Sequence, residues 1–184
     1  FDTYGSDDPA CHSNVFMSHS SNGRKWSVPI QISTEGSCKD DSSSPSGAIT
    51  AASADGKNVY IAWSSQGKIY IDRSMDGGGT WLSNDILIAD QAGGWKLNVP
   101  GVNRYSGLPT LVCDNTKKGK LSGVLYLVYS DQRHGEDDTD VWFMRSVNHG
   151  DNWTQAVQIS AGEKGKHQYF PQVTVDPSTG YVYI

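Results

Sequence analysis

The sequence is poor in cysteine, proline and methionine, and it contains no long apolar run. Its 184 residues include three Cys, seven Pro and three Met. The cysteines show no Cys-x-x-Cys spacing and have no histidine at a zinc-ligand interval, which excludes a dense disulfide framework and a cysteine-based zinc site. The longest apolar run, Val124 to Tyr129, is far shorter than the roughly 20 residues of a membrane helix. We therefore expect no membrane insertion.

Positive charge is also scarce. The chain carries 15 Lys and Arg against 20 Asp and Glu, a formal net charge of -5. Nucleic acids and anionic membranes bind basic surfaces, so neither is expected as a partner. The length allows one domain, or a part of a larger one.

Glycine and aromatic residues, in contrast, are abundant. The chain has 20 Gly, nine Tyr and six Trp. Short runs rich in Val, Ile and Tyr alternate with Gly, Asp, Asn and Ser, which is typical of strands joined by tight turns. No segment shows the 3.6-residue periodicity of a helix. The sequence therefore predicts an all-β protein.

One eight-residue pattern recurs with identical spacing. It reads Ser-x-(Asp/Asn)-x-Gly-x-x-Trp, and its two full copies are built on Ser74, Asp76, Gly78 and Trp81, and on Ser146, Asn148, Gly150 and Trp153. A degenerate copy runs from His19 to Trp26, where Gly23 and Trp26 keep their places while His19 and Ser21 replace Ser and Asp. We interpret the pattern as a structural turn in which Asp or Asn accepts amide hydrogen bonds, Gly supplies a positive φ, and Trp packs back over the turn.

Strand-like runs flank each copy in the same order. One run precedes it and one follows it, and two more come later, the first beginning at Pro45, Pro109 or Pro171 and the second rich in aromatics. Four short antiparallel strands in a repeat of roughly 60 residues are the signature of propeller blades. Counted along the chain, this order predicts twelve strands, grouped as two, eight and two.

These boxes resemble the Asp-box, or BNR, repeats of the sialidase-like β-propellers. The resemblance implies that residues 1–184 form a partial β-propeller of about three blades' worth, part of a six-bladed ring. Residues 1–33 would supply the last two strands of one blade. Two complete blades would follow at 45–89 and 109–160, and 171–184 would supply the first two strands of a further blade. Both ends cut through a strand pattern, so we expect either a piece of a larger propeller or two copies that close a ring head to tail.

The family topology places the boxes on the face away from any binding site. Functional residues are then expected in the loops at the opposite face, where aromatic rings beside Arg or carboxylates suit sugar binding by stacking and hydrogen bonding. The candidate glycan-binding residues from these loops are Arg133, Asp131, His134, Glu136, Arg104, Tyr105, His167, Tyr169, Asp2 and Tyr4.

The segment from Asp131 to Asp140 is the richest in charge, with five carboxylates around one Arg and one His. It could form a sugar or carboxylate site with Arg133 as the clamp, a calcium site using Asp137, Asp138 and Asp140, or a solvated charge run that ties down a loop. We expect no cofactor, with calcium as the open alternative. Cys11 and Cys38 fall in adjacent loops of this same face, which suggests a disulfide between them, with Cys113 buried in a strand.

The resemblance implies two alternative functions. Sialidases carry an arginine triad whose first member stands in an Arg-(Ile/Leu)-Pro motif, but here Gly107-Leu108-Pro109 and Tyr169-Phe170-Pro171 lack the arginine. The chain is thus expected to belong to a secreted or cell-surface glycoside hydrolase that is complete only with further blades, or to a non-catalytic propeller module that binds glycan or protein or acts as a spacer. A β-sandwich lectin would not explain the recurrent box position. The expected partners are extracellular glycans or glycoproteins.

Overall fold

The structure is a computed structural model that describes residues 13–39, 41–102, 105–117, 120–160 and 162–184. Within these residues it contains twelve strands and no helix, and each strand overlaps or directly follows a run predicted to be extended. The strands are β1 (Phe16–Met17), β2 (Ile30–Gln31), β3 (Ser46–Ala52), β4 (Val59–Ser65), β5 (Lys68–Ser74), β6 (Ile86–Asp90), β7 (Thr110–Cys113), β8 (Leu125–Asp131), β9 (Asp140–Ser146), β10 (Val157–Gln158), β11 (Thr174–Val175) and β12 (Val182–Tyr183). The prediction of an all-β protein is confirmed.

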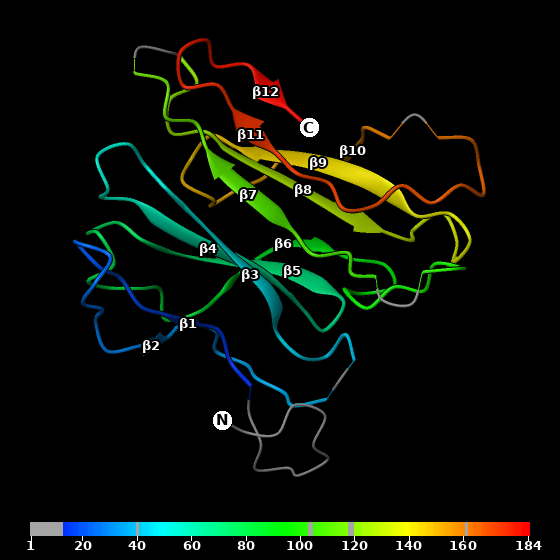
Figure 1. Ribbon diagram of the computed structural model, residues 1–184, viewed down its shortest axis with the longest axis horizontal. Coiled ribbons are helices and arrows are strands. Elements are labelled where there is room, and N and C mark those ends of the chain that lie inside the picture. Colours follow the sequence, from blue (N-terminus) through cyan, green and yellow to red (C-terminus); the bar gives the residue numbers. More distant parts are fainter. Residues whose placement is uncertain (1–12, 40, 103–104, 118–119, 161) are drawn as a thin grey trace.

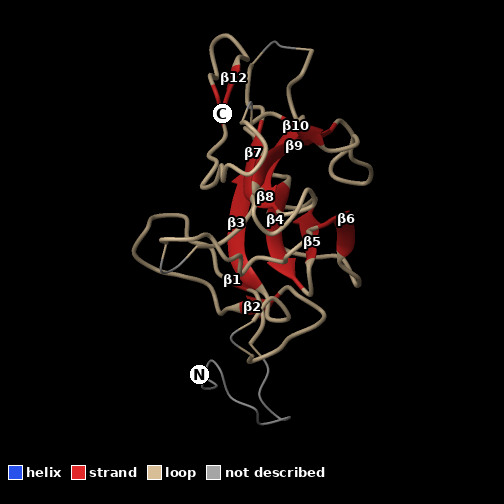
Figure 2. Cartoon of the chain, turned by 90° about the vertical axis from the view of Figure 1, so that its right-hand side faces the viewer, coloured by secondary structure: helices blue, strands red, loops and turns tan. Residues whose placement is uncertain are grey.

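The strands form four antiparallel sheets whose members follow one another along the chain. Two sheets have four strands, in the orders β3-β4-β5-β6 and β7-β8-β9-β10, and two have two strands, β1-β2 and β11-β12. The first strands of successive sheets lie side by side, because β3 contacts β7 and β7 contacts β11 (Figure 1). Seen from the side, β3 to β6 follow one another across the molecule from left to right (Figure 2).

The core lies between these sheets rather than under one of them. Tyr60, Ala62, Ile69 and Ile71 of one four-stranded sheet pack against Leu111, Leu125, Leu127, Tyr129, Trp142 and Met144 of the other. Ile61 and Trp63, on the other face of β4, pack against the β1-β2 pair. Tyr126 and Val128, on the other face of β8, pack against the β11-β12 pair. Since β4 and β8 are covered on both faces, they read as nearly continuous apolar runs rather than alternating ones.

The two full boxes form the same turn, as the hydrogen bonds show. In the β5–β6 box, the amide of Gly78 donates to Ser74 Oγ at 2.8 Å and that of Thr80 donates to Asp76 Oδ1 at 2.8 Å. In the β9–β10 box, the amide of Gly150 donates to Ser146 Oγ at 2.9 Å and that of Asn152 to Asn148 Oδ1 at 3.1 Å. Gly78 and Gly150 have φ of 94° and 88°. In each, the indole Nε1 donates to the glycine carbonyl at 3.2 Å.

The degenerate box between β1 and β2 uses different residues from those expected. Ser20 Oγ, not the side chain of His19, accepts from the Gly23 amide at 2.9 Å. Asn22 Oδ1, not Ser21, accepts from the amides of Arg24 and Lys25 at 2.9 and 3.0 Å. Trp26 is 64 % exposed, so it does not cover its turn as Trp81 and Trp153 do. The assignment of His19 and Ser21 was wrong because the turn shifts by one residue to reach Ser and Asn side chains, which are better acceptors for turn amides.

No described helix is long and apolar enough to cross a membrane.

Candidate functional site

The connections opposite the boxes lie together at one end of the four-stranded sheets, which we call the loop end (Figure 1, right). The Gln132 amide donates to the carbonyl of Ala92 at 3.0 Å, and its side chain donates to the carbonyl of Asn98 at 3.1 Å. The Gln168 amide donates to the carbonyl of Thr139 at 2.7 Å. These bonds join the segments after β6, β8 and β10 into one surface.

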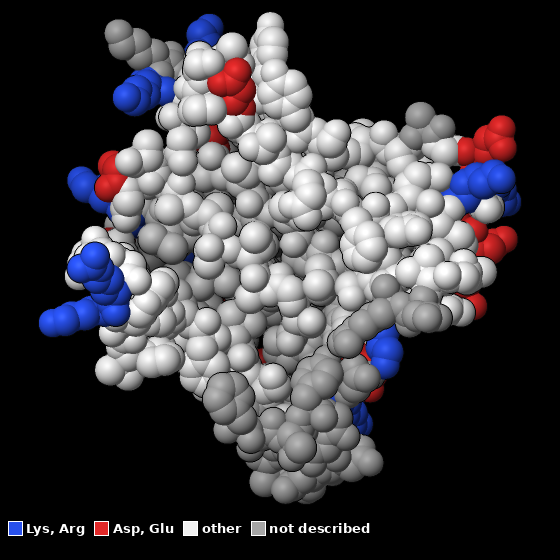
Figure 3. All heavy atoms as spheres, viewed as in Figure 1, with Lys and Arg blue, Asp and Glu red and all other residues white. Residues whose placement is uncertain are grey.

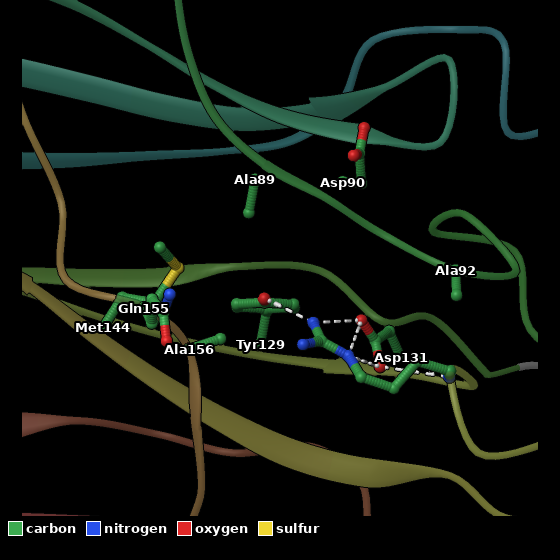
Figure 4. A pocket seen from close by; sticks show the side chains of 9 residues that line it. Ala89, Asp90, Ala92, Tyr129, Asp131, Met144, Gln155 and Ala156 are labelled. Atoms are coloured by element: carbon green, nitrogen blue, oxygen red, sulfur yellow. Dashed lines mark hydrogen bonds and ion pairs between the residues drawn. The ribbon is translucent and has the colours of Figure 1, made fainter.

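Arg133 is held tightly at this end. Its Nε donates to both oxygens of Asp131 at 3.0 Å, and its Nη2 donates to Asp131 Oδ2 at 2.6 Å and to the Tyr129 hydroxyl at 2.8 Å. The guanidinium carbon stands 3.8 Å from the centroid of the Trp142 ring. Figure 4 shows Tyr129 and Asp131 directed toward the same guanidinium from one strand. Arg133 thus has an ion pair, a stacking partner and a hydroxyl, and is mainly a structural cation.

Burial makes these bonds strong. The Asp131 side chain is 0 % exposed and that of Arg133 is 31 % exposed. Desolvation opposes the charge on Arg133, but the hydrogen bonds and electrostatic attraction from Asp131 and Tyr129 together outweigh it and raise the pKa of Arg133. Burial likewise raises the pKa of Tyr129. Both groups therefore keep their protons, and neither is poised for proton transfer.

The register explains why two basic residues, Arg133 and His134, follow one another in the loop after β8. Asp131 and Asp140 are directly opposite each other in the β8–β9 ladder, and both are buried. Like charges at opposed positions destabilise a ladder. Arg133 pairs with Asp131, and His134 Nδ1 contacts Asp140 Oδ2 at 2.7 Å, so each carboxylate has a basic neighbour.

A cavity of about 520 Å³ lies beside Arg133, between β6 and the β8–β9 hairpin (Figure 4). Its lining includes Asp90, Tyr129, Asp131, Arg133 and Gln155. Because Arg133 already pairs with Asp131, this cavity lacks an unpaired cation for a sugar carboxylate.

A second cavity, of about 330 Å³, lies where the first strands of three sheets begin. It is lined by Gly47 to Ile49 from β3, Leu108 to Thr110 at β7, and Phe170 to Gln172 before β11. Phe170 is 59 % exposed and Tyr169 is 37 % exposed. Phe170 also has a φ of 58°, which is uncommon for a bulky side chain and is typical of strained positions near binding sites. We call this cavity the first-strand cavity, and Tyr169 and Phe170 the aromatic lip. The lip presents aromatic surface to solvent.

Tyr105 supports the lip from below. It is 3 % exposed, and its ring contacts those of Tyr169 and Phe170 at centroid distances of 4.7 and 5.4 Å. Burial raises the pKa of Tyr105 to about 12. Tyr105 therefore positions the two outer rings rather than offering its own face to a ligand.

The remaining predicted residues are scattered over the loop end. His167 Nδ1 lies 2.9 Å from Thr139 Oγ1 and ties two loops together, while Glu136 and Asp137 are exposed. Asp138 and Asp140 are buried beside His134. Asp2, Tyr4, Cys11 and Arg104 lie outside the described residues.

Cys38 is disulfide-bonded. Its pairing with Cys11 stays a prediction, because Cys11 lies outside the described residues. Cys113 is a free buried thiol, and burial raises its pKa to about 11.

Trp142, Tyr129 and Phe170 belong to the site but are not among the residues predicted from the sequence. The signal for the first two was strand alternation: Tyr129 and Asp131 are two apart on β8, and Trp142 is the ladder partner of Tyr129. In the sequence, Phe170 stands only at the middle position of the Arg-(Ile/Leu)-Pro motif. It is exposed and has a left-handed backbone conformation, which no sequence pattern indicates.

The described arginines are engaged or lie away from the first-strand cavity. Arg73 bonds to the His149 carbonyl and to Asp151 at 2.6 Å each, near a box. Arg24 lies in the degenerate box and Arg145 on β9, close to the β9–β10 box. Neither these three arginines nor Arg133 lines that cavity.

No protein-family model matches the chain, and no curated protein sequence is significantly similar to it.

Proposed function

We propose that this chain forms part of a sialidase-like Asp-box β-propeller that acts on glycans outside the cell, and that its loop end binds carbohydrate at the first-strand cavity. The single observation that carries the proposal is the exposed aromatic pair formed by Phe170, which lines that cavity, and Tyr169, whose ring packs on that of Phe170. Exposed aromatic faces beside polar groups are the usual platform for sugar rings.

The surface around the lip suits a neutral ligand. Charged side chains gather at the rim of the face in Figure 3, and its centre over β3 and β7 is largely uncharged. A disulfide at Cys38 fits an oxidising environment, and so supports a secreted or cell-surface location.

The same geometry favours binding over hydrolysis by these residues. A sialidase needs arginines free to hold the substrate carboxylate, whereas Arg133 is already paired with Asp131. The alternative, a glycosidase whose catalytic groups come from further blades, requires those blades to supply the arginines that face the cavity.

Glycan-array binding by the 184-residue chain tests the proposal. We expect selective binding of some glycans by the wild type, and its loss in Phe170→Ala. Phe16→Ala is the matched control, because Phe16 is 56 % exposed on β1, outside the cavity lining. Equal binding by both variants, or no binding to any glycan by the folded chain, would contradict the proposal. Turnover of a fluorogenic sialoside or another aryl glycoside would instead favour the glycosidase.

The propeller itself is part of the proposal. It is supported by consecutive four-stranded antiparallel sheets whose first strands adjoin, and by both two-stranded pairs. Apolar side chains on those pairs are open to solvent: Phe16 at 56 %, Ile30 at 39 % and Tyr183 at 53 %. Further strands, from additional blades or from a second copy, would cover them. Native mass spectrometry distinguishes the two: a two-chain species supports closure by a second copy, and a single chain supports additional blades.

A further inference from the structure

Asp138 is a buried carboxylate without a partner. It is 7 % exposed, and its side chain makes no hydrogen bond or ion pair with any described residue. Its backbone amide is satisfied, donating to the carbonyl of Gly135 at 3.1 Å. A mostly buried carboxylate is unfavourable unless something compensates its charge. The Asp138 side chain faces a cavity without a hydrogen-bond or ion-pair partner among the described residues, and a positive group added there would stabilise it.

Two further ligand-type side chains converge with Asp138. One ligand atom each from His134, Asp138 and Asp140 lie within 4.8 Å of one another. All three line a cavity of about 340 Å³, together with Gln158, Gly162 and Lys164. This cavity is distinct from the one beside Arg133 and from the first-strand cavity, which share no lining residue with it.

The supporting contacts leave these atoms directed at one point. Asp140 Oδ1 accepts from Gln158 Nε2 at 2.7 Å and from Ser160 Oγ at 2.9 Å, so the carboxylate is fixed through one oxygen. Its other oxygen, Oδ2, faces His134 Nδ1 at 2.7 Å. The His134 ring is packed edge-to-face on Trp142, with centroids 5.5 Å apart. Metal ligands are typically oriented by such an outer layer of hydrogen bonds and packing.

We propose that His134, Asp138 and Asp140 bind a divalent transition-metal ion of the zinc class. One imidazole nitrogen and two carboxylates match the N/O ligands of zinc, whereas calcium takes six to eight oxygens and does not use imidazole. Three protein ligands leave a position for water on the cavity side. The ion replaces the His134–Asp140 contact and joins the loop after β8 to the first residue of β9.

This site differs from the calcium site considered for Asp137, Asp138 and Asp140. Asp137 is exposed and lies outside the group of converging ligand atoms. Asp137 and Asp138 are thus adjacent residues of equal charge, of which one is a ligand and the other is not. They offer a matched pair of variants.

The test is a titration of the chelator-treated 184-residue chain with Zn²⁺, followed by calorimetry and by thermal unfolding. We expect one ion bound per chain and a rise in the melting temperature. Asp138→Asn should weaken zinc binding at least tenfold and abolish the rise, whereas Asp137→Asn should bind like the wild type. Lys164→Met should bind more tightly, because it removes the ammonium group that Lys164 contributes to the described lining of the cavity. Circular dichroism confirms that each variant is folded.

Equal zinc affinity in the Asp137 and Asp138 variants would overturn the proposal. So would binding of calcium that both variants weaken alike. Cobalt substitution adds a readout of the ligand set: visible bands without a thiolate charge-transfer band, lost in His134→Gln, are expected. A thiolate band would place the ion at Cys113 instead and would also overturn the proposal.

Discussion

The two ends of the four-stranded sheets use polar residues in opposite ways. At the box end, the β5–β6 and β9–β10 turns repeat the same bonds with Ser74 and Asp76 in one and Ser146 and Asn148 in the other. At the loop end, β4 and β5 are joined by the two residues Gln66 and Gly67, whereas β8 and β9 are joined by residues 132–139. Polar groups that repeat between sheets serve the fold, and those that occur in one sheet only are the candidates for function.

Arg133 tests this comparison between the two ends most strongly. It lies at the loop end, but its ion pair with Asp131 stabilises the fold. We expect Arg133→Met to lower the free energy of unfolding by about 3 kcal/mol, because it leaves the Asp131 carboxylate buried and unpaired opposite Asp140. Urea unfolding measures this. The control is Lys68→Met, whose partner Asp90 has a side chain 83 % exposed.

Lys68→Met should have no measurable effect, since this ion pair is at the surface, with Asp90 largely in water and Lys68 partly so. The double variant Arg133→Met with Asp131→Leu should recover most of the stability lost in Arg133→Met. Similar effects in Arg133→Met and Lys68→Met would show that the buried pair has no special role.

The box tryptophans test whether the three turns are equivalent. Trp153 packs against the main core, so Trp153→Ala should cost about 2–3 kcal/mol, less than for a fully buried ring. Trp26 is 64 % exposed, and Trp26→Ala should change stability by less than about 0.5 kcal/mol. Equal losses by chemical denaturation would mean that the degenerate box is as well packed as the others.

The box serines make a smaller difference. Ser146→Ala removes the acceptor of the buried Gly150 amide and should cost about 1–2 kcal/mol. Ser20→Ala removes an exposed bond to Gly23, and we expect a change below about 0.5 kcal/mol. Thermal unfolding of the two variants side by side measures the difference. A larger loss at Ser20 would reverse the order of the two turns.

The smallest expected effect is a pH dependence that only one full box has. Hydrogen bonds from Ser74 and then Thr80 lower the pKa of Asp76 to about 2, from an ordinary value of 3.8. Because the folded-state pKa is the lower one, the stabilisation is present above about pH 4 and is lost as the pH falls toward 2. Asn148 occupies the same position in the other box and does not titrate.

Asp76→Asn should therefore weaken the pH dependence of the melting temperature between pH 4 and 2, and Asn148→Asp should strengthen it. Asp176→Asn is a control for acid sensitivity elsewhere, because hydrogen bonds from Ser178 also lower the pKa of Asp176 to about 2. An unchanged acid profile in Asp76→Asn would mean that the box carboxylate contributes nothing measurable.

The sequence predicted the strands far better than the site. Each strand has a local signature, as in Pro109 before β7 or the apolar run of β8, and local signatures survive in any context. The glycine and tryptophan of the full boxes were also read correctly as turn residues. The shift of the degenerate turn to Ser20 and Asn22 was missed, because neighbouring Ser and Asn side chains compete for the same amides.

The site depends on long-range placement, which one sequence does not reveal. Arg133 was interpreted as a ligand clamp, but its neighbour Trp142 comes from the next strand and occupies its face. Asp137 and Asp138 are indistinguishable in the sequence, yet one is exposed and the other is buried. Phe170 is exposed and has a left-handed backbone conformation, which no sequence pattern indicates. The partners of Arg133 come from two strands that the sequence alone does not pair.

The most direct test of the account is the affinity of the best glycan-array ligand for the wild type, Phe170→Ala and Arg133→Met, measured by titration calorimetry on folded protein. The account predicts at least a tenfold loss of affinity in Phe170→Ala, and an unchanged affinity in Arg133→Met, because the lip binds the ligand and Arg133 serves the fold. A loss in Arg133→Met with full affinity in Phe170→Ala would contradict it.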